Sequence, residues 1–250
     1  MEHDLFLLGA GFVGALMNAL AGGGSFVTLP ALIAVGVPSV EANASSTVAL
    51  WPGGAASAWT YHEGRQRICG IGTGLMLAVT LAGGFAGSLL LLWTPSSSFN
   101  VILPWMLLLA TLALAFGRRI GPALQGRLNG RRGPVVLIQF ALGAYGGYFG
   151  GAVGLMMVAA WSALGEHEIK MLNGPRTLLV SAANTIAVVT FAFAGAVRWP
   201  ETLAILVGGL AGGFAGAKIG RAVPAHVACV ATLFWTAGVT LVFFSRAYLG

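Results

Sequence analysis

Charged residues are scarce in this chain of 250 residues. Asp, Glu, Lys and Arg together make up 8% of it, whereas soluble globular proteins contain about 25%. Hydrophobic residues make up 57%, and so few charges could not keep so much apolar surface in water. The composition therefore excludes a soluble enzyme, a disordered chain and a nucleic-acid-binding module. It indicates a polytopic membrane protein with about eight to ten helical segments.

The chain also lacks the residue clusters of metal and redox centres. Its two cysteines, Cys69 and Cys229, lie far apart, and its four histidines are scattered. It has no Cys-x-x-Cys pair, no P-loop and no Ser/His/Asp arrangement. No Asp or Glu falls within an apolar segment, where it could relay protons. We therefore predict that the protein binds no cofactor and no metal, and that it is not an enzyme.

Ten apolar runs account for most of the chain. They are uninterrupted, which favours helices, because the strands of a membrane barrel alternate apolar and polar residues. The runs are 5–20, 25–36, 42–61, 69–93, 99–117, 135–153, 154–164, 171–194, 202–222 and 226–245. We predict an all-α polytopic membrane protein built from these segments.

Two of the runs are too short to be ordinary membrane spans. As helices, 25–36 and 154–164 would be about 18 and 16 Å long, against an apolar bilayer core of roughly 30 Å. Each follows a glycine-rich break, Gly22-Gly23-Gly24 in one case and Gly150-Gly151 in the other. We expect each short helix to form a hairpin or a broken helix with the run before it. If both hairpins are re-entrant, six full spans remain.

The two halves of the sequence repeat one another. The heptapeptide Leu-Ala-Gly-Gly-Phe-Ala-Gly occurs at 81–87 and again at 210–216. Asn43-x-x-x-Thr47 recurs as Asn173-x-x-x-Thr177, and the order of the matching motifs is kept. We predict an internal duplication, which is a common plan of secondary transporters. The Gly-x-x-x-Gly spacing within the heptapeptide is typical of closely packed membrane helices, so we interpret it as structural.

Basic residues indicate how the chain crosses the membrane. The segment between the halves contains five Arg and no acid. The positive-inside rule places the N-terminus outside and the four most basic loops, 62–67, 118–134, 165–170 and 218–225, in the cytoplasm. With five segments in each half, the two repeats would have inverted topology. The predicted domains are repeat 1 (1–117), a basic cytoplasmic linker (118–134) and repeat 2 (135–250).

The glycine run Gly22, Gly23 and Gly24 is the first candidate binding site. Glycine permits a break in the helix and lets backbone approach a ligand closely. The helix after the break begins with free N–H groups and a positive dipole end, which favour an anion. Ser25 could cap this helix, and Thr28 lies one turn further. The alternative is that the glycines only allow close helix packing.

Uncharged polar side chains mark the start of the next segment. Asn43, Ser46 and Thr47 are expected to open that helix, together with Ser45. Their amide and hydroxyl groups could bind an oxyanion without burying a fixed charge. N-capping and hydrogen bonds between helices are the alternative explanation.

In the second half, Arg176 is the residue that we expect to contact an anion. It lies between Asn173 and Thr177 at the start of a long apolar helix, and Asn184 follows further along that helix. Ionisable residues at membrane depth are functional candidates, and a guanidinium can hold an oxyanion with two parallel hydrogen bonds. The alternative is that Arg176 extends to the cytoplasmic membrane surface.

One set of motifs also carries a family resemblance. The motifs are Gly11-x-x-Gly14, Ala21-Gly22-Gly23-Gly24-Ser25-x-x-Thr28-x-Pro30-Ala31-Leu32, Gly36-Val37-Pro38, Ala42-Asn43-Ala44-Ser45-Ser46-Thr47 and Gly143-Ala144-Tyr145-Gly146-Gly147-Tyr148-Phe149-Gly150. In these motifs the chain resembles the sulfite exporter TauE/SafE family, also called the toluene-sulfonate uptake permeases. Ser25 stands where a fourth glycine is common in that family. The resemblance implies a bacterial inner-membrane carrier for sulfite, sulfonates or related anions.

The residues and the resemblance together predict a secondary transporter. We expect it to move a small sulfur-containing oxyanion (sulfite, a sulfonate, a sulfoacetate-like anion or thiosulfate) across the inner membrane by alternating access. The expected partners are this anion and membrane lipid, and no nucleic acid, with a homodimer left open. An anion channel or a non-transporting membrane protein is the alternative.

Overall fold

The computed structural model describes residues 2–60, 67–123, 132–164, 172–220, 222 and 225–248. Within these ranges the chain forms ten helices and no strand, apart from an isolated bridge between Ile68 and Ile71. The helices are α1 (Glu2–Ala21), α2 (Ser25–Ala34), α3 (Ser39–Thr60), α4 (Thr73–Trp93), α5 (Ser96–Ala123), α6 (Arg132–Tyr148), α7 (Val153–Ala163), α8 (Asn173–Phe193), α9 (Trp199–Ile219) and α10 (Ala225–Tyr248). The prediction of an all-α protein with ten helical segments is confirmed.

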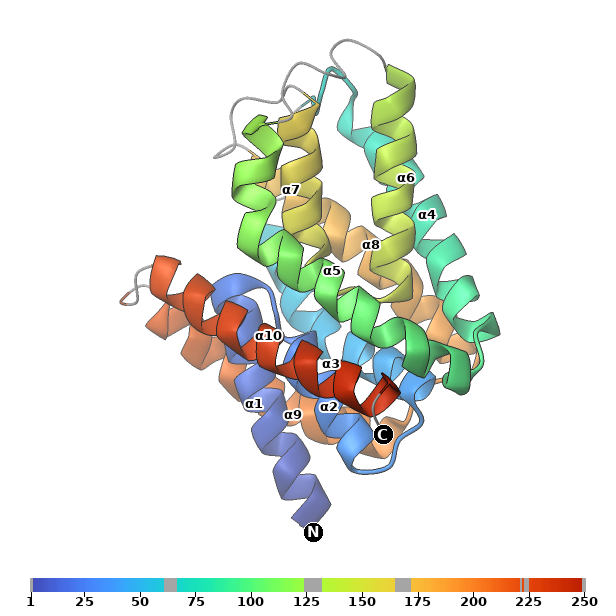
Figure 1. The fold of residues 1–250 in the computed structure, drawn as a ribbon. Coiled ribbons are helices and arrows are strands. Elements are labelled where there is room, and N and C mark those ends of the chain that lie inside the picture. Colours follow the sequence, from blue (N-terminus) through green and yellow to red (C-terminus); the bar gives the residue numbers. More distant parts are fainter. Residues whose placement is uncertain are drawn as a thin grey trace.

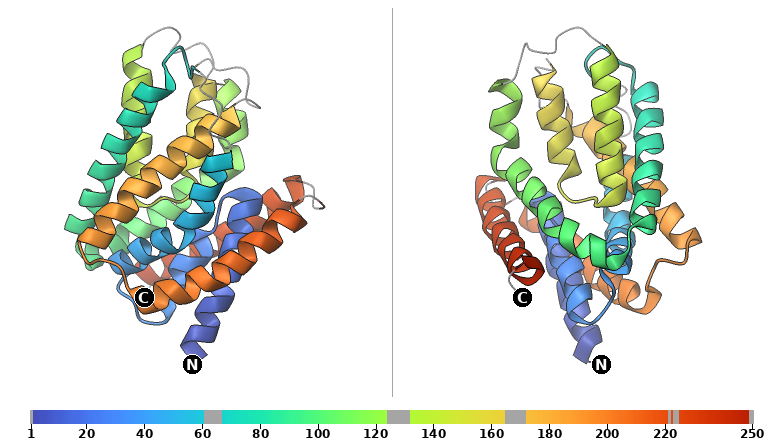
Figure 2. Two further views of the ribbon diagram at one scale, coloured as in Figure 1. Left: turned by 180° about the vertical axis from the view of Figure 1, so that it is seen from behind. Right: turned by 45° about the vertical axis from the view of Figure 1, so that its right-hand side comes forward.

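The helices form two groups, with α3 and α8 between them. In one group α1 packs against α2, α9 and α10; in the other α6 packs against α4 and α7, and α5 packs against α7. Figure 1 shows α1, α9 and α10 in the lower part of the molecule and α4, α6 and α7 in the upper part, and Figure 2 shows the same arrangement from two other sides. Each group therefore contains helices from both halves of the sequence.

Helices at matching positions of the two halves have matching partners. The first helix of each half packs against the fourth helix of the other half, as α1 on α9 and α6 on α4. The third helices pack against each other, as α3 on α8, and so do the fifth helices, α5 and α10. Helix α5 extends into the predicted basic linker 118–134 as far as Ala123, and α6 begins within it at Arg132. Residues 124–131 lie outside the described residues.

The repeated heptapeptide makes the two closest of these helix contacts. A Cβ atom on Gly87 would overlap the carbonyl oxygen of Ala144 in α6. A Cβ atom on Gly212 would likewise overlap the carbonyl oxygen of Phe12 in α1. Backbones can approach this closely only where side chains are absent. The structural interpretation of the two Gly-x-x-x-Gly motifs agrees with these contacts.

Six of the described helices are long and apolar enough to cross a membrane: α1, α4, α5, α8, α9 and α10. Six spans were also predicted for the case in which both hairpins are re-entrant, but the six helices are not the same ones. The 20-residue α1, the first arm of a hairpin, is included. The 22-residue α3 is not included, because polar residues such as Asn43 and Ser46 lower its hydropathy.

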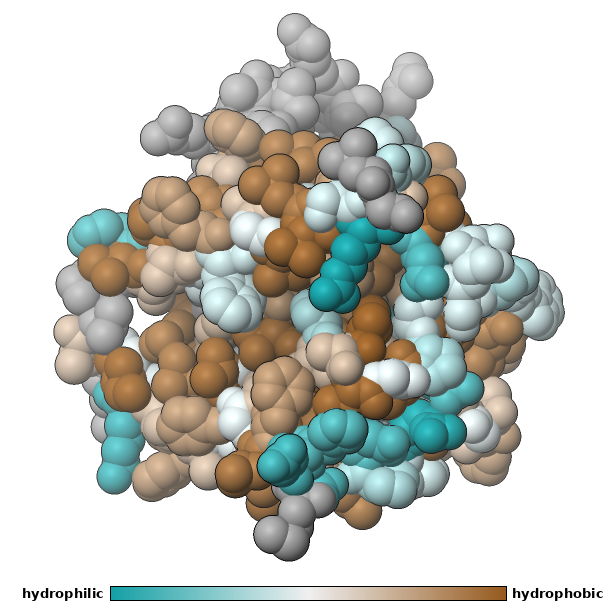
Figure 3. All heavy atoms as spheres, turned by 60° about the horizontal axis from the view of Figure 1, so that its bottom comes forward, coloured by the Kyte–Doolittle hydropathy of each residue, from teal (hydrophilic) through white to brown (hydrophobic). Residues whose placement is uncertain are grey.

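Large apolar side chains cover much of the outer surface. Phe193 is 92% exposed, Trp59 78% and Phe234 76%. Figure 3 shows that the visible face is largely hydrophobic, with the hydrophilic residues gathered in a few patches. Apolar patches of this extent are rare on soluble monomers, whereas lipid tails would cover them at no cost. The surface thus agrees with the predicted membrane location.

Candidate functional site

The first helix break joins α1 to α2 in a hairpin. Gly22 has a left-handed backbone with φ of 82°, and its N–H donates to the carbonyls of Met17 and Asn18. Gly24, at the start of α2, lies so close to α1 that an added Cβ would be 2.7 Å from the Gly14 carbonyl oxygen. The short helix therefore folds back along the last turns of α1.

The three glycines of this break each have a structural role. Gly22 supplies the positive φ of the turn, which side chains disfavour. Gly23 is buried against Thr232 of α10, and Gly24 is buried between α1 and Leu50 of α3. The expectation that Ser25 caps α2 is wrong: Ser25 is its first residue, the N-cap is Gly24, and no side chain caps the helix.

Two predicted site residues, Thr28 and Ser46, meet just beyond this break. Their hydroxyl oxygens are 2.6 Å apart, and the Thr28 hydroxyl also lies 3.3 Å from the Gly24 carbonyl. Both side chains are fully buried. The two hydroxyls thus bond each other and hold α2 against α3.

The second break joins α6 to α7. Gly150 and Ala152 both have positive φ, of 77° and 56°. The Gly150 N–H donates to the carbonyl of Tyr145 at 3.3 Å, whereas an uninterrupted helix would direct it to Gly146. Ala152 is the N-cap of α7 and supplies no side-chain cap. The first N–H groups of α7, at Val153 and Gly154, precede the first backbone bond of that helix, from Leu155 to Ala152.

Asn43 connects this second break to α3. Its amide nitrogen donates to the Tyr148 carbonyl at 2.8 Å, and the side chain is 1% exposed. The expectation that Asn43 opens its helix is wrong, because α3 begins at Ser39. The residue therefore lies in the second turn and faces another helix, as the alternative of hydrogen bonds between helices predicted.

Polar atoms from three helices surround Gly150. A Cβ atom added to Gly150 would lie 3.5 Å from the Gly146 carbonyl oxygen, 3.7 Å from Asn184 Oδ1 and 3.9 Å from Thr47 Oγ1. Thr47 belongs to α3 and Asn184 to α8. The space that the glycine leaves open is therefore lined by oxygens from both halves of the chain.

Arg176 lies beside the start of α7. A Cβ atom on Gly154 would be 3.4 Å from both Cγ and Cδ of Arg176. The Arg176 side chain is half-buried, in the first turn of α8. Its aliphatic part thus packs against the first turn of the short helix. The nearby Asn173 is exposed, and the Thr177 hydroxyl donates to the Asn173 carbonyl of its own helix.

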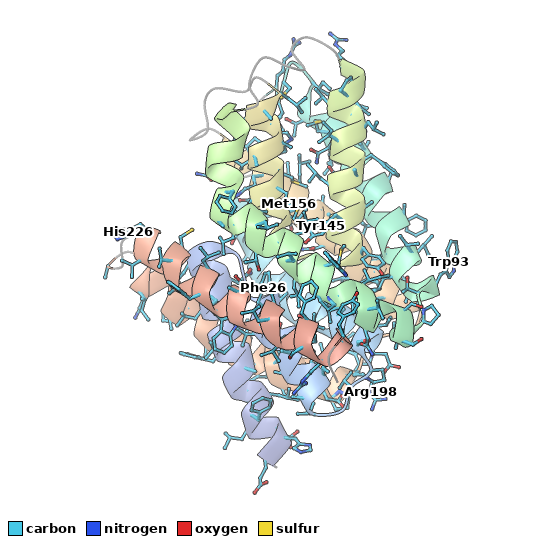
Figure 4. All side chains as sticks on the ribbon, viewed as in Figure 1. Phe26, Trp93, Tyr145, Met156, Arg198 and His226 are labelled. Carbon is cyan, nitrogen blue, oxygen red and sulfur yellow. The ribbon has the colours of Figure 1, made fainter. Side chains whose placement is uncertain are left out.

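The predicted site residues thus fall into two clusters. Gly22, Gly23, Gly24, Ser25, Thr28 and Ser46 belong to the first hairpin, and Asn43, Thr47, Asn184 and Arg176 to the second break. The two breaks are linked through the rings of Phe26 and Phe149, whose centroids are 6.4 Å apart. Figure 4 shows Phe26 and Tyr145 near the centre of the molecule and Arg198 and His226 at its periphery.

Sequence reasoning placed Gly150 in the second break but did not count it or Gly154 among the candidate site residues. Gly150 leaves the space between the oxygens, and Gly154 accommodates Arg176. The signal was present, since Gly150 occupies the same place in the second half as Gly22 in the first, each after a glycine-rich helix. Among the described residues, no group of three or more His, Cys, Asp or Glu side chains could hold a metal ion.

The protein is a multi-pass helical membrane protein with two helix breaks, the first packed against α3 and the second beside α3 and α8. A model of the sulfite exporter TauE/SafE family matches residues 7–243. The chain therefore belongs to the TauE/SafE family, as its sequence motifs indicated.

Curated relatives are similar over most of their length. The probable membrane transporter protein YfcA of Escherichia coli (strain K12) is 28% identical over 212 residues, which cover 84% of this chain and 76% of the relative. A probable membrane transporter protein of Haemophilus influenzae is 25% identical over 209 residues, covering 84% and 82%. No solved structure matches the chain.

The family and these relatives establish the general activity. The chain is a multi-pass bacterial membrane protein and a membrane transporter. The relatives are described as transporters and not as enzymes, which confirms the prediction that this protein is not an enzyme.

Proposed function

We propose that this transporter carries a small sulfur-containing oxyanion, such as sulfite, a sulfonate, a sulfoacetate-like anion or thiosulfate, across the inner membrane. The family description names sulfite export. The single observation that carries the proposal is that the Arg176 side chain of α8 packs against Gly154. Gly154 lies in the first turn of α7, the helix that starts at the second break. A cation and a helix N-terminus at one place favour an anion there.

The chemistry of this place suits a tetrahedral or pyramidal oxyanion. The first N–H groups of a helix have no partner within that helix, and the dipole adds positive potential at that end. Ala152 leaves the start of α7 without a side-chain cap. The guanidinium of Arg176 can add two parallel hydrogen bonds to two oxygens of one anion.

Alternating access is the mechanism that we propose for transport. An inverted repeat supplies two equivalent arrangements of its halves around one site. The matching partners of equivalent helices, such as α1 on α9 and α6 on α4, support this mechanism. The central contact between α3 and α8 supports a site at the interface of the repeats.

Anion affinity of Arg176 variants tests the proposal. In purified protein in detergent, Arg176→Gln should weaken sulfite or sulfonate binding about 10- to 150-fold, because a charge-assisted contact contributes roughly 1.5–3 kcal/mol. Arg176→Lys should recover part of the affinity, since an ammonium cannot hold two oxygens in a fixed plane.

Arg198→Gln is the matched control. Arg198 is an exposed residue that pairs with Glu41 and Glu201 at distances of 3.7 and 3.8 Å, so its loss should leave anion binding unchanged. If Arg176→Gln and Arg176→Lys both bind the anion like the wild type, Arg176 is a membrane-surface residue and the proposal fails. A conductance without saturable exchange in proteoliposomes would favour the alternative, an anion channel.

A further inference from the structure

In place of the sequence-based prediction that no metal is bound, we propose that the oxygens around Gly150 form a binding site for a monovalent metal cation, next to the anion site at Arg176. This inference rests on the proposed function, because the cation would be bound and moved together with the anion. The site consists of Thr47 Oγ1, the Gly146 carbonyl oxygen and Asn184 Oδ1, from α3, α6 and α8. Asn43 Oδ1, whose amide group is bonded to Tyr148 at the end of α6, is a further buried acceptor beside the break.

The Asn43 side chain presents an oxygen that has no hydrogen-bond partner among the described residues. Its amide nitrogen is engaged by the Tyr148 carbonyl at 2.8 Å. The reverse orientation would bring two oxygens together, so the hydrogen-bond partner determines which atom is the nitrogen. The remaining atom, Oδ1, is buried and accepts no hydrogen bond from the described residues. An oxyanion would be repelled by this atom, whereas a cation would be attracted.

The oxygens of Thr47 and Gly146 also have lone pairs that are free to accept. The one hydroxyl hydrogen of Thr47 is donated to the Asn43 carbonyl at 2.9 Å, which leaves two acceptor positions on its oxygen. The Gly146 carbonyl is bypassed, because the Gly150 N–H donates to Tyr145 instead. It also lies at the C-terminal end of α6, where the helix dipole is negative and favours a cation.

Asn184 completes the cluster from α8. Its Oδ1 is buried, accepts no hydrogen bond from the described residues, and lies 3.7 Å from the position that a Cβ on Gly150 would take. Three neutral oxygens, from Thr47, Gly146 and Asn184, thus lie within 4 Å of the position that a Cβ on Gly150 would take. Discontinuous membrane helices bind cations through such carbonyl groups at their C-terminal ends.

The charges of the surrounding segments select a monovalent ion. Neither α6, α8 nor the residues 149–152 between α6 and α7 contain an Asp or Glu. The one acid of α3, Glu41, is paired with Arg198 at 3.7 Å. Divalent cations need carboxylate ligands, so uncharged oxygens alone suit Na⁺ or K⁺. On the other side of the break, the α7 N-terminus and Arg176 favour an anion, and the two bound charges would compensate each other.

The binding of Na⁺ to purified full-length protein tests this site. Radioactive Na⁺ is titrated at constant ionic strength, with choline as the replacement ion, and K⁺ is tested as a competitor. The wild type should bind Na⁺, or K⁺ in its place, at a single saturable site. Thr47→Val and Asn184→Leu each remove one ligand with little change of shape, and each should weaken the cation affinity by about 10-fold or more.

Thr190→Val is the matched control. Thr190 lies on the same helix as Asn184, and its hydroxyl donates to a carbonyl of its own helix, as that of Thr47 does. This variant should bind the cation like the wild type, and thermal unfolding confirms that each variant is folded. The absence of saturable Na⁺ or K⁺ binding in the wild type overturns the proposal, as does wild-type affinity in both Thr47→Val and Asn184→Leu.

Sulfite binding in choline buffer separates this inference from the proposed function. If sulfite binds through Arg176 but no metal cation binds, the cation site is wrong and the anion site stands. If Na⁺ binds at the oxygens around Gly150 but no sulfur oxyanion binds at all, the cation site stands and the proposed substrate class is wrong.

Discussion

Gly24 at the first break and Gly154 at the second differ in how closely other atoms surround them. Gly24 is enclosed by α1, since an added Cβ would be 2.7 Å from the Gly14 oxygen and 2.8 Å from Asn18 Cβ. A Cβ on Gly154 would meet only side chains, Val180 Cγ2 at 3.2 Å and the Arg176 methylenes at 3.4 Å, and the long Arg176 side chain can move. A substitution at Gly24 would therefore disturb the hairpin itself, whereas one at Gly154 acts on the residue that we place at the anion.

Gly154→Val should displace Arg176 without breaking the helix pair. The branched side chain would occupy the space where the Arg176 methylenes lie, so the guanidinium would leave the start of α7. We expect sulfite affinity to fall about 10-fold, which corresponds to roughly 1.4 kcal/mol, and Gly154→Ala to have a smaller effect. Isothermal titration calorimetry in detergent measures both values.

Gly133→Val is the control for this comparison. Gly133 lies near the start of α6, with nothing within 4 Å of an added Cβ. It should bind sulfite like the wild type. Unchanged sulfite affinity in Gly154→Val would mean that the position of Arg176 beside α7 does not matter for binding.

At the scale of helices, the repeated heptapeptide makes the same contact twice. In α4 it packs on α6, and in α9 it packs on α1, so each copy binds the first helix of the other half. Within the copy in α9, the two adjacent glycines have opposite surroundings. Gly212 faces the backbone of Phe12, whereas nothing lies within 4 Å of a Cβ on Gly213.

Alanine at these two positions should have opposite effects on stability. Gly212→Ala forces α1 and α9 apart, and overpacking of this kind costs about 1–3 kcal/mol. Gly213→Ala adds only helix propensity, which contributes up to about 1 kcal/mol in favour of folding. Thermal unfolding in a single detergent compares the two variants. An equal loss of stability in both would show that the close α1–α9 contact is not what the glycine provides.

At the scale of the whole molecule, the helix ends that flank three of the four loops predicted to be cytoplasmic lie at one end. The ends of α5 and α7 and the starts of α4 and α6 lie together at the upper end of Figure 1. They flank the predicted cytoplasmic loops 62–67, 118–134 and 165–170, most of whose residues lie outside the described ranges. In Figure 4, Trp93 and Arg198 lie to the right and His226, which follows the predicted cytoplasmic loop 218–225, lies to the left.

Cysteine labelling in whole cells should reproduce this orientation. With Cys69 and Cys229 replaced by serine, Ser97→Cys, in the first turn of α5, should react with an impermeant maleimide added outside. Gly133→Cys should react only after the membrane is permeabilised, because the basic linker beside it faces the cytoplasm. Both positions are exposed. The reverse pattern would place the N-terminus inside and invert every loop.

The sequence by itself determined the class of fold, the helix positions and the two breaks. Composition and uninterrupted apolar runs are sufficient for this, because a bilayer permits helices of defined length and little else. The glycine runs marked the breaks correctly, since a positive φ such as that of Gly22 or Gly150 is a local property of the chain. The family followed from the same motifs.

The tertiary structure alone decided which polar residues meet. Sequence spacing grouped Asn43 with Ser46 and Arg176 with Asn173, but the packing of α3 against α8 brings Thr47 and Asn184 together across the two halves. It also decided which donor groups already form hydrogen bonds within the protein. Asn43 was expected to help bind an anion, yet its amide nitrogen is engaged by Tyr148 and its oxygen remains. Such a preference depends on hydrogen-bond partners distant in the sequence, which no local pattern specifies.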